Sequence, residues 1–285
     1  MPFGYIGYNG LMNKEDYFIK QFSHSKFIGD DGAIVGSYVY SADAFFENVH
    51  FKREWMSLKE IAQKAMLVNI SDAIAMNAKP KYALLTVAIP KSYTHKELDE
   101  LALGFKKTAQ KFGIEIIGGD TICNEKLDIS VTIISKSKRP VLRSGMKKGD
   151  LLCYTGELGQ SLKHLNALLK GEKIPKKSKF IKPKLNAKFF YEIASYVSAG
   201  MDISDGLFFE LERLSKANTL GFEFFSSIPN EIGCSGEEYE LLFSFAPQYQ
   251  KKIEKIAHKH NIKLTIVAKA VKGSYECKCK GHHFE

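Results

Sequence analysis

Apolar residues along this chain follow two spacings, one helical and one typical of buried strands. In 57–75, apolar side chains at 61, 65, 68 and 75 recur as on one face of a helix. Ser57 and Glu60 precede them as a capping box, which marks a helix start. Asp72 falls on the same face, where a carboxylate is unfavourable unless its charge is compensated. The pattern predicts a buried helix in which Asp72 is either a structural residue or a metal ligand.

The same two spacings predict the other elements. Helices are expected at 14–22, 94–112, 161–169, 185–197, 207–215 and 248–260. Strands are expected at 37–43, 83–89, 114–117, 127–135, 151–155, 221–225 and 263–270, with a buried strand after the acidic residues 237–240. The strand at 114–117 is expected to stop at Gly118. Helices that alternate with strands in this way are typical of a layered α/β or α+β domain.

A basic, polar segment divides the chain into two parts. Residues 136–150 contain Pro140, Gly145 and Gly149, and 285 residues are enough for two cores. We therefore expect an N-terminal domain at 1–138, a linker at 139–150 and a C-terminal α/β domain at 151–285. The first eleven residues are irregular and Gly-rich, and we interpret them as a dispensable extension.

Composition limits the location of the protein. Hydrophobic residues make up 45% and charged residues 26% of the chain, which is typical of a soluble globular protein. A run of about 18 apolar residues is absent, so no membrane span is expected. The N-terminus has no secretory pattern. Five cysteines, an odd and scattered set, favour reduced thiols and a cytoplasmic location.

The basic charge raises two alternatives. A net charge of +9 is compatible with nucleic-acid binding, but the lysines are spread over the chain and their densest group, 173–184, is typical of a loop. We interpret them as a solvated surface that suits polyphosphate ligands, and expect no nucleic-acid role. Cys277, Cys279, His282 and His283 could bind zinc, although their spacing does not match a zinc finger.

Aspartates gather at turns and at strand ends in both halves of the chain. Those at 30 and 31 lie between glycines, and those at 202 and 205 precede a helix that Ser204 or Asp205 could cap. Oxygen ligands suit Mg²⁺, which proteins bind through a few carboxylates together with substrate phosphates. Such a site would serve phosphoryl transfer, and no Ser–His or Cys–His pair competes with this interpretation. The candidates are Asp30, Asp31, Asp43, Asp72, Asp120, Asp202 and Asp205.

Seven stretches, taken in order, resemble the thiamine-monophosphate kinase family. They are 29–33, 41–43 with His50 and Phe51, 68–78, 118–121, 143–150, 201–207 and 236–241. The resemblance extends from about residue 27 to the C-terminus. The superfamily also contains aminoimidazole ribonucleotide synthetase, selenophosphate synthetase and the hydrogenase maturation carbamoyl dehydratase. The His-Phe pair and the run from Gly236 to Leu241 are similar to the thiamine branch.

The resemblance implies a two-domain PurM-like fold of the α/β (α+β) class. In this fold the mixed N-terminal sheet, with its helices, pairs across a homodimer, and a C-terminal α/β domain closes the cleft. The implied activity is transfer of the γ-phosphoryl group of ATP to thiamine monophosphate. The implied magnesium positions are Asp31, Ser41, Ala42 through its backbone, Asp43, Asp72, Asp120, Asp202 and Asp205, and we add Asp30 beside them. Gly119, Asp120, Arg143 and Ser204 match ATP contacts, and His50 and Glu237 match substrate contacts.

The expected chemistry needs no catalytic side chain. A phosphate monoester has a second pKa of about 6, so it is already an anionic nucleophile at neutral pH. Mg²⁺ ions and Arg143 would offset the repulsion between two phosphates.

Departures from the family pattern affect the ring contacts most. Ala42 stands where Thr is common, Asn77 where Gly is usual and Glu238 where Asp is usual, and the tail at 281–284 lacks the family's aromatic residue. Rival interpretations are another ATP-using member of the superfamily, of the aminoimidazole ribonucleotide synthetase or selenophosphate synthetase type, and a basic nucleic-acid-binding protein. Selenophosphate synthetase needs an early reactive Cys, whereas no Cys precedes Cys123, and the dehydratase ends in Cys.

Overall fold

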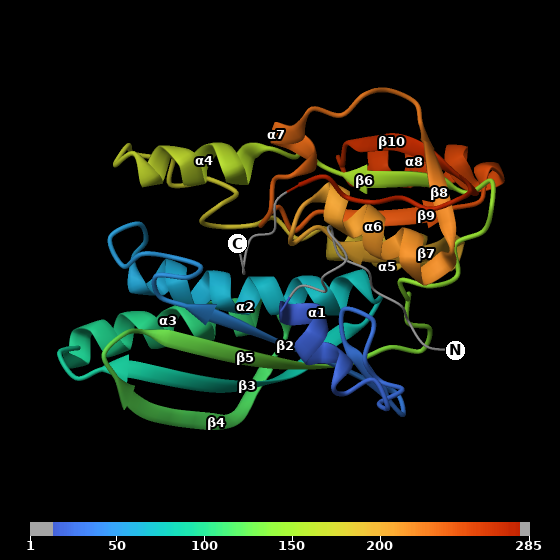
Figure 1. Ribbon diagram of the computed structural model, residues 1–285. Helices are drawn as coiled ribbons and strands as arrows, with labels where there is room; N and C mark the ends of the chain where they lie inside the picture. Colours follow the sequence, from blue (N-terminus) through green and yellow to red (C-terminus); the bar gives the residue numbers. More distant parts are fainter. Residues whose placement is uncertain (1–13, 280–285) are drawn as a thin grey trace.

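A computed structural model describes residues 14–279, which form two five-stranded sheets with a long helix between them (Figure 1). The first sheet has the order β1-β2-β5-β3-β4, in which β3 and β4 are parallel and the other pairs antiparallel. Its strands are β1 (Ala33–Val35), β2 (Tyr38–Phe46), β3 (Lys79–Pro90), β4 (Glu115–Asn124) and β5 (Asp128–Lys136). The α/β class and the mixed N-terminal sheet are as predicted.

Helix α3 (His95–Phe112) makes the crossover that the parallel pair requires. Thr94 and Glu97 form its capping box, and Gly113 ends it in the left-handed conformation that favours glycine. The short α1 (Lys14–Lys20) precedes the first sheet. Both helices lie close to their predicted positions.

The second sheet is wholly antiparallel, with the order β7-β9-β6-β10-β8. Its strands are β6 (Leu151–Thr155), β7 (Val197–Asp202), β8 (Leu220–Phe224), β9 (Leu241–Phe245) and β10 (Leu264–Lys272). The helices of this half are α4 (Gln160–Leu169), α5 (Ala187–Ile193), α6 (Leu207–Asn218), α7 (Asn230–Gly233) and α8 (Gln250–Lys259). The helix predicted at 185–197 is shorter than expected, because a 3₁₀ turn follows α5 and Val197 already belongs to β7.

Helix α2 (Leu58–Ala75) occupies the middle of the molecule, above the first sheet and below the second half (Figure 1). The predicted capping box of Ser57 and Glu60 is present. Fourteen of its 18 residues are buried, so the single apolar face that the sequence predicted is too narrow. A helix buried on nearly every side belongs to a core rather than to a surface. One apolar cluster accordingly runs from Phe45 of β2 through Ile70 of α2 to Phe243 of β9.

Strand β4 is longer than predicted. It continues through Gly118 and Gly119 to Asn124, so Asp120 lies within an edge strand and not in a loop after it. A Cβ atom at Gly119 would collide with the backbone of Leu85 in β3, and Gly119 has a φ of +144°. The paired glycines therefore allow two parallel backbones to pack closely, which a sequence alone cannot separate from a loop that binds a ligand.

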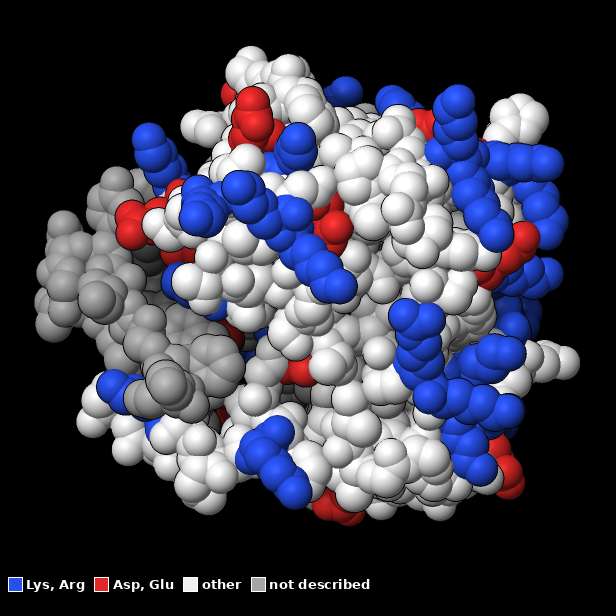
Figure 2. Space-filling view, turned by 90° about the vertical axis from the view of Figure 1, so that its right-hand side faces the viewer, with Lys and Arg blue, Asp and Glu red and all other residues white. Residues whose placement is uncertain are grey.

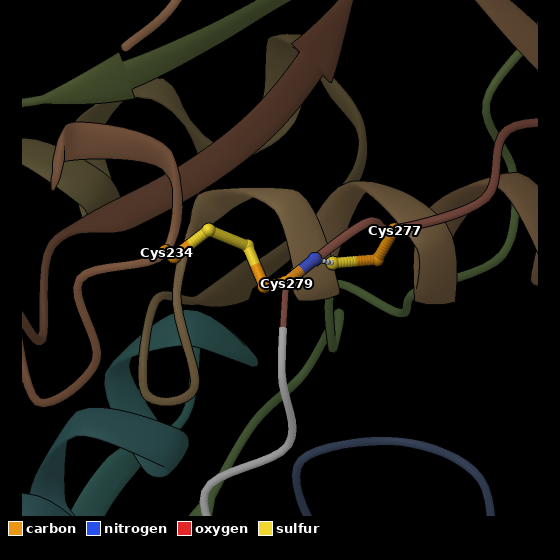
Figure 3. The surroundings of a disulfide bond; sticks show 3 residues. All are labelled: Cys234, Cys277 and Cys279. Atoms are coloured by element: carbon orange, nitrogen blue, oxygen red, sulfur yellow. Dashed lines mark hydrogen bonds between the residues drawn. A yellow bond between two sulfur atoms is a disulfide. The ribbon is translucent and has the colours of Figure 1, made fainter. Parts of the chain in front are cut away.

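A disulfide joins Cys234 to Cys279 and ties the C-terminal segment to the loop after α7 (Figure 3). The prediction of reduced thiols throughout is therefore wrong for these two residues, whereas Cys123, Cys153 and Cys277 are free. The backbone N–H of Cys279 donates to Sγ of Cys277 at 3.3 Å. The predicted N-terminal extension (1–11), His282 and His283 lie outside the described residues.

Among helices within residues 14–279, none is long and apolar enough to cross a membrane. Lys and Arg side chains are spread over the face seen in Figure 2, gather toward its right-hand edge and are interspersed with Asp and Glu.

We expect Cys234→Ser to lower the free energy of unfolding by about 2–4 kcal/mol under oxidising conditions, because the crosslink restricts the unfolded chain. The two cysteines are 45 residues apart in sequence. Urea denaturation with and without reductant measures the effect. Cys123→Ser, at an exposed free thiol, is the matched control, and its change should stay within about 0.5 kcal/mol. Equal midpoints for the oxidised and reduced wild type would contradict the prediction.

Candidate active site

Asn69 fastens the middle of β2 to α2 and thereby positions Asp43, which the sequence placed at the strand's end although β2 continues to Phe46. Its Oδ1 accepts the backbone N–H of Asp43 at 2.9 Å, and its carbonyl accepts the hydroxyl of Ser41 at 3.2 Å. One helical turn later, the carboxyl group of Asp72 shares a hydrogen bond with that of Asp43. Two carboxyl groups can share a hydrogen bond only if one holds a proton, or they can share a cation instead.

Asp202 reaches the same place from the second sheet, at the end of β7. The hydroxyl of Ser71, the residue before Asp72, donates to Oδ2 of Asp202 at 2.5 Å. Asp202 is only 2% exposed. A serine on α2 therefore links the helix to the other half of the chain, and aspartates from both halves meet at one position.

Burial and mutual repulsion raise the pKa values of this group. Desolvation is the largest cause of the raised pKa of Asp43, Asp72 and Asp202, and the charge of Asp31 adds to each. The pKa values of Asp72 and Asp202 lie well above the usual range for aspartate. We call Asp31, Asp43, Asp72 and Asp202 the aspartate cluster. Because opposite charge favours ionised carboxylates, a cation among them would relieve this repulsion.

Arg143 holds the two aspartates that precede β1. Its guanidinium donates to Oδ1 of Asp31 from both Nε, at 2.9 Å, and an Nη atom, at 2.6 Å. Its backbone N–H donates to Oδ1 of Asp30 at 2.7 Å. Asp30 thus anchors the linker backbone, and its pKa is raised chiefly by burial. Oδ2 of Asp31 is buried and has no hydrogen-bond partner among the described residues, which leaves it available to a cation.

The segment after β7 is held by Glu210 rather than by a side-chain cap. The predicted capping of this helix by Ser204 or Asp205 is wrong, because Gly206 is the N-cap of α6 and makes no such bond. Instead, Oε1 of Glu210 accepts the backbone N–H groups of Ser204 (3.3 Å) and Asp205 (2.9 Å). Arg213 then bridges Glu210 and Asp205, both at 2.6 Å. The charge of Asp205 also contributes to the raised pKa of Asp43, which places Asp205 near the cluster.

The two predicted substrate residues lie toward the start of α2. Oε2 of Glu237 accepts the ammonium of Lys64 at 3.1 Å. His50 packs on Phe45, with 5.7 Å between ring centroids, and Phe45 in turn lies 5.5 Å from the Lys64 ammonium. Nδ1 of His50 accepts the backbone N–H of Phe46 at 3.0 Å, which shapes the turn after β2. Phe45 and Lys64 therefore connect His50 with Glu237.

Within the described chain, three of the predicted site residues do not bring a side chain to the aspartate cluster. Gly119 and Asp120 lie on the exposed edge strand β4, and a carboxylate oxygen of Asp120 accepts the N–H of Thr121. Strands β5 and β3 separate β4 from β2, which carries Asp43. The side chain of Ala42 is exposed, so only its backbone can serve the site.

The aspartate cluster fits Mg²⁺ in its chemistry. Among residues 14–279, no three His, Cys, Asp or Glu side chains converge closely enough to enclose an ion unaided. Mg²⁺ does not need such a cage, because it usually keeps several waters and is held by one or two carboxylates plus substrate phosphates. The all-oxygen donor set and the unpartnered Oδ2 of Asp31 agree with this mode of binding.

Comparisons with known proteins agree with this geometry. Residues 29–136 match the family model of the AIR synthase related protein, N-terminal domain. The thiamine-monophosphate kinase of Leptospira interrogans is 33% identical over 72% of this chain and 74% of its own length. That of Buchnera aphidicola is 31% identical, with 85% and 83% covered. The chain belongs to the thiamine-monophosphate kinase family. It is therefore a phosphotransferase.

Solved structures of the family share its fold. AaThiL, in complex with AMPPCP and TMP, has a TM-score of 0.82 at 26% identity and covers 93% of this chain and 94% of its own. Thiamine monophosphate kinase from Aquifex aeolicus gives 0.80 at 25%, with 94% and 95% covered. A chain of the HypE–HypF complex has a TM-score of 0.75 at 15% identity, which shows the fold alone. The predicted PurM-like fold is thus confirmed.

Sequence reasoning missed the residues that hold the acidic motifs of this chain in place. Asn69 and Ser71 stand inside the quoted motif of α2, and Glu210 and Arg213 follow the motif at 201–207. The available signal was an apolar stretch, 65–75, that contains three polar residues, Asn69, Ser71 and Asp72. Each of those, once buried, must find a partner.

Glu238 holds the start of another helix, since its carboxylate accepts the N–H groups of Gly159 and Ser161 at the start of α4.

We expect Arg213→Met to lower the free energy of unfolding by about 3–5 kcal/mol, since it leaves the buried Glu210 without its cation. Thermal and urea denaturation measure it. Lys216→Met is the matched control, because it removes a lysine from the same helix that pairs with the more exposed Glu212, and it should cost about 0.5 kcal/mol or less. Equal losses in the two variants would contradict a specific role for Arg213.

Proposed function

We propose that this chain transfers the γ-phosphoryl group of ATP to thiamine monophosphate and so forms thiamine diphosphate. The observation that carries the proposal is the meeting of Asp43, Asp72 and Asp202 beside the Asp31–Arg143 pair, in a chain of this family. The complex of AaThiL with AMPPCP, an ATP analogue, and TMP supports the choice of both substrates.

Each group has a role in the proposed reaction. Mg²⁺, when bound by Asp31, Asp43, Asp72 and Asp202, supplies charge neutralisation for the phosphates. Arg143, already beside the cluster, would add positive charge at the transferred group. The backbone of Ser204, fixed by Glu210, would position ATP, and His50 and Glu237 would position the acceptor. The acceptor phosphate is itself the nucleophile, so no general base is assigned.

Rival functions find less support. The first cysteine in the chain is Cys123, which does not suit the selenophosphate synthetase branch. The interspersed charges in Figure 2 favour a solvated surface over nucleic-acid binding. We also propose a cytoplasmic location, where ATP is available. The disulfide Cys234–Cys279 is the feature least usual for that compartment.

We further propose a homodimer that pairs through the first sheet. Strand β4 is exposed along all ten residues and carries Ile116, Ile117 and Ile122 with 37%, 50% and 53% exposure. A long apolar edge strand is a liability unless something covers it, and a second copy of the chain is the partner that the family resemblance implies. Asp120 stands on this strand, which makes it a candidate ligand for the partner's cluster.

We expect the purified chain to convert thiamine monophosphate and ATP to thiamine diphosphate and ADP in the presence of Mg²⁺, and to lose this turnover when EDTA removes the metal. Product formation is followed by chromatography with a panel of phosphate acceptors that includes thiamine, pyridoxal phosphate and nucleoside monophosphates. Turnover of another acceptor without thiamine diphosphate would overturn the proposal.

Asp72→Asn tests the metal site, because it keeps the side chain's shape and removes its charge. We expect kcat to fall at least about 100-fold, because a metal position is lost. Its thermal midpoint should not fall, since the substitution removes repulsion within the aspartate cluster. An active Asp72→Asn enzyme would exclude this residue from the metal site.

We expect the wild type to sediment as a dimer and Ile117→Lys to sediment as a monomer with an unchanged circular dichroism spectrum.

Mixing Asp72→Asn with Asp120→Asn subunits tests where Asp120 acts. If it acts on the partner's cluster, exchange should restore up to about a quarter of wild-type turnover, since half of the dimers regain one intact site. A monomeric wild type would refute the dimer, and a failure to restore turnover would assign Asp120 to its own subunit.

A further inference from the structure

Lys64 is a buried cation that the proposed reaction does not use. It lies on α2 with a fully buried side chain, and its ammonium sits 3.9 Å from the centre of the Phe180 ring. Burial lowers its pKa, against the opposing effect of Glu237. An isolated ammonium in such a place is costly, and an apolar residue of similar size is often at least as stable. Stability alone therefore gives little reason for a lysine here.

The partner of Lys64 sits in a strained loop. Glu237 has a φ of +54° and Tyr239 a φ of +51°, both unusual for residues with a side chain. The N–H of Glu237 donates to the carbonyl of Ser204 at 2.6 Å, and that of Tyr239 to Ile203 at 2.8 Å. The loop is thus fixed to the segment that follows Asp202.

The carboxylate of Glu237 is half engaged. Its Oε2 accepts the ammonium of Lys64 at 3.1 Å, whereas its Oε1 is buried and has no hydrogen-bond partner among residues 14–279. A buried acceptor without a partner costs free energy unless a ligand supplies a donor. Lys64 therefore fixes Oε2 of Glu237 and leaves Oε1 to accept a hydrogen bond from a ligand.

The spacing along α2 relates this pair to the aspartate cluster. Positions 64, 68 and 72 are one turn apart, so Lys64 and Asp72 lie on the same face, about 12 Å apart along the axis. One helix therefore carries the phosphoryl-transfer site and, two turns earlier, the cation that holds Glu237. Such a separation suits an acceptor that bears its phosphate at one end and a hydrogen-bond-donating ring at the other.

We propose that Lys64 is a positioning residue for the acceptor, in that it holds Glu237 so that Oε1 accepts a hydrogen bond from the amino-bearing ring at the end of the acceptor remote from its phosphate. The inference rests on the proposed function, because it assigns the ring end of thiamine monophosphate to this carboxylate. Lys64 itself is covered by protein and acts through Glu237.

The experiment compares steady-state kinetics of Lys64→Met, Glu237→Gln and the double variant. We expect each single variant to raise KM for thiamine monophosphate about 10-fold, and the double variant to raise it no further, because both remove the same contact. Additive effects, about 100-fold in the double variant, would show that Lys64 does not act through Glu237.

Two readouts separate positioning from folding. Calorimetric binding of AMPPCP to Lys64→Met should be unchanged, since the backbone of Ser204 stays fixed by Glu210 and by the backbone N–H of Glu237, and the substitution removes neither contact. Lys179→Met is the matched control, because Lys179 pairs with Glu238 (3.2 Å) and Glu240 (2.7 Å) on the same segment but not with Glu237. It should lower the thermal midpoint without the rise in KM. An equal rise in KM for Lys179→Met would overturn the proposal in favour of a general loosening of the loop.

The outcomes distinguish this inference from the proposed function. A wild type that phosphorylates thiamine monophosphate, together with a Lys64→Met variant of unchanged KM, overturns the inference alone. A wild type that neither binds nor phosphorylates thiamine monophosphate overturns both. The side chain of Glu237 is 24% exposed, so water can reach it in Lys64→Met, and the double variant leaves no unpaired charge.

Discussion

Repulsion between closely placed carboxylates is the constraint on which the candidate site depends. Asp31, Asp43, Asp72 and Asp202 come from four places in the sequence, and bringing them together raises the pKa values of Asp43, Asp72 and Asp202 through desolvation and like charge. Like charge and desolvation both oppose this arrangement while the carboxylates are ionised and no cation is bound. It is held by groups that do not belong to the aspartate cluster, namely Asn69, Ser71 and Arg143, each bound to one of its members. These contacts offset the unfavourable free energy of placing the aspartates close together.

Helix α2 is the element that makes this possible. Because it is buried between two sheets, its polar residues can reach partners on both sides. Asn69 binds β2 of the first sheet, Ser71 binds Asp202 of the second, and Lys64 binds the loop before β9. The apolar cluster that runs through α2 into both halves fixes these distances. The site residues are therefore preorganised by contacts within the fold.

Local pattern predicted much of this fold, whereas the partners of buried polar groups were beyond its reach. The capping box at Ser57 is a local signal, and α2 begins where it indicates. The Gly118-Gly119 pair was misread because a turn and a close parallel pairing both need glycine, and only the position of Leu85 separates them. The ordered motifs predicted the aspartates, since acidic residues beside glycines are conspicuous. Glu210 and Arg213 have the i,i+3 spacing of a helix pair, but their contacts with Ser204 and Asp205 reach back across the helix start, which no spacing rule describes.

The buried polar groups of α2 also explain why its sequence is neither a surface helix nor an ordinary core helix. Lys64, Asn69, Ser71 and Asp72 would each destabilise an apolar core if left unpaired. In the structure the first three meet a carboxylate, a backbone amide and a second carboxylate, and only Asp72 has like charges for its nearest partners. That asymmetry identifies the one position on the helix where the protein alone does not complete the charge balance. A divalent cation bound with a nucleotide's phosphates would complete it, so the same residue that is least satisfied in the fold is the one best placed for phosphoryl transfer.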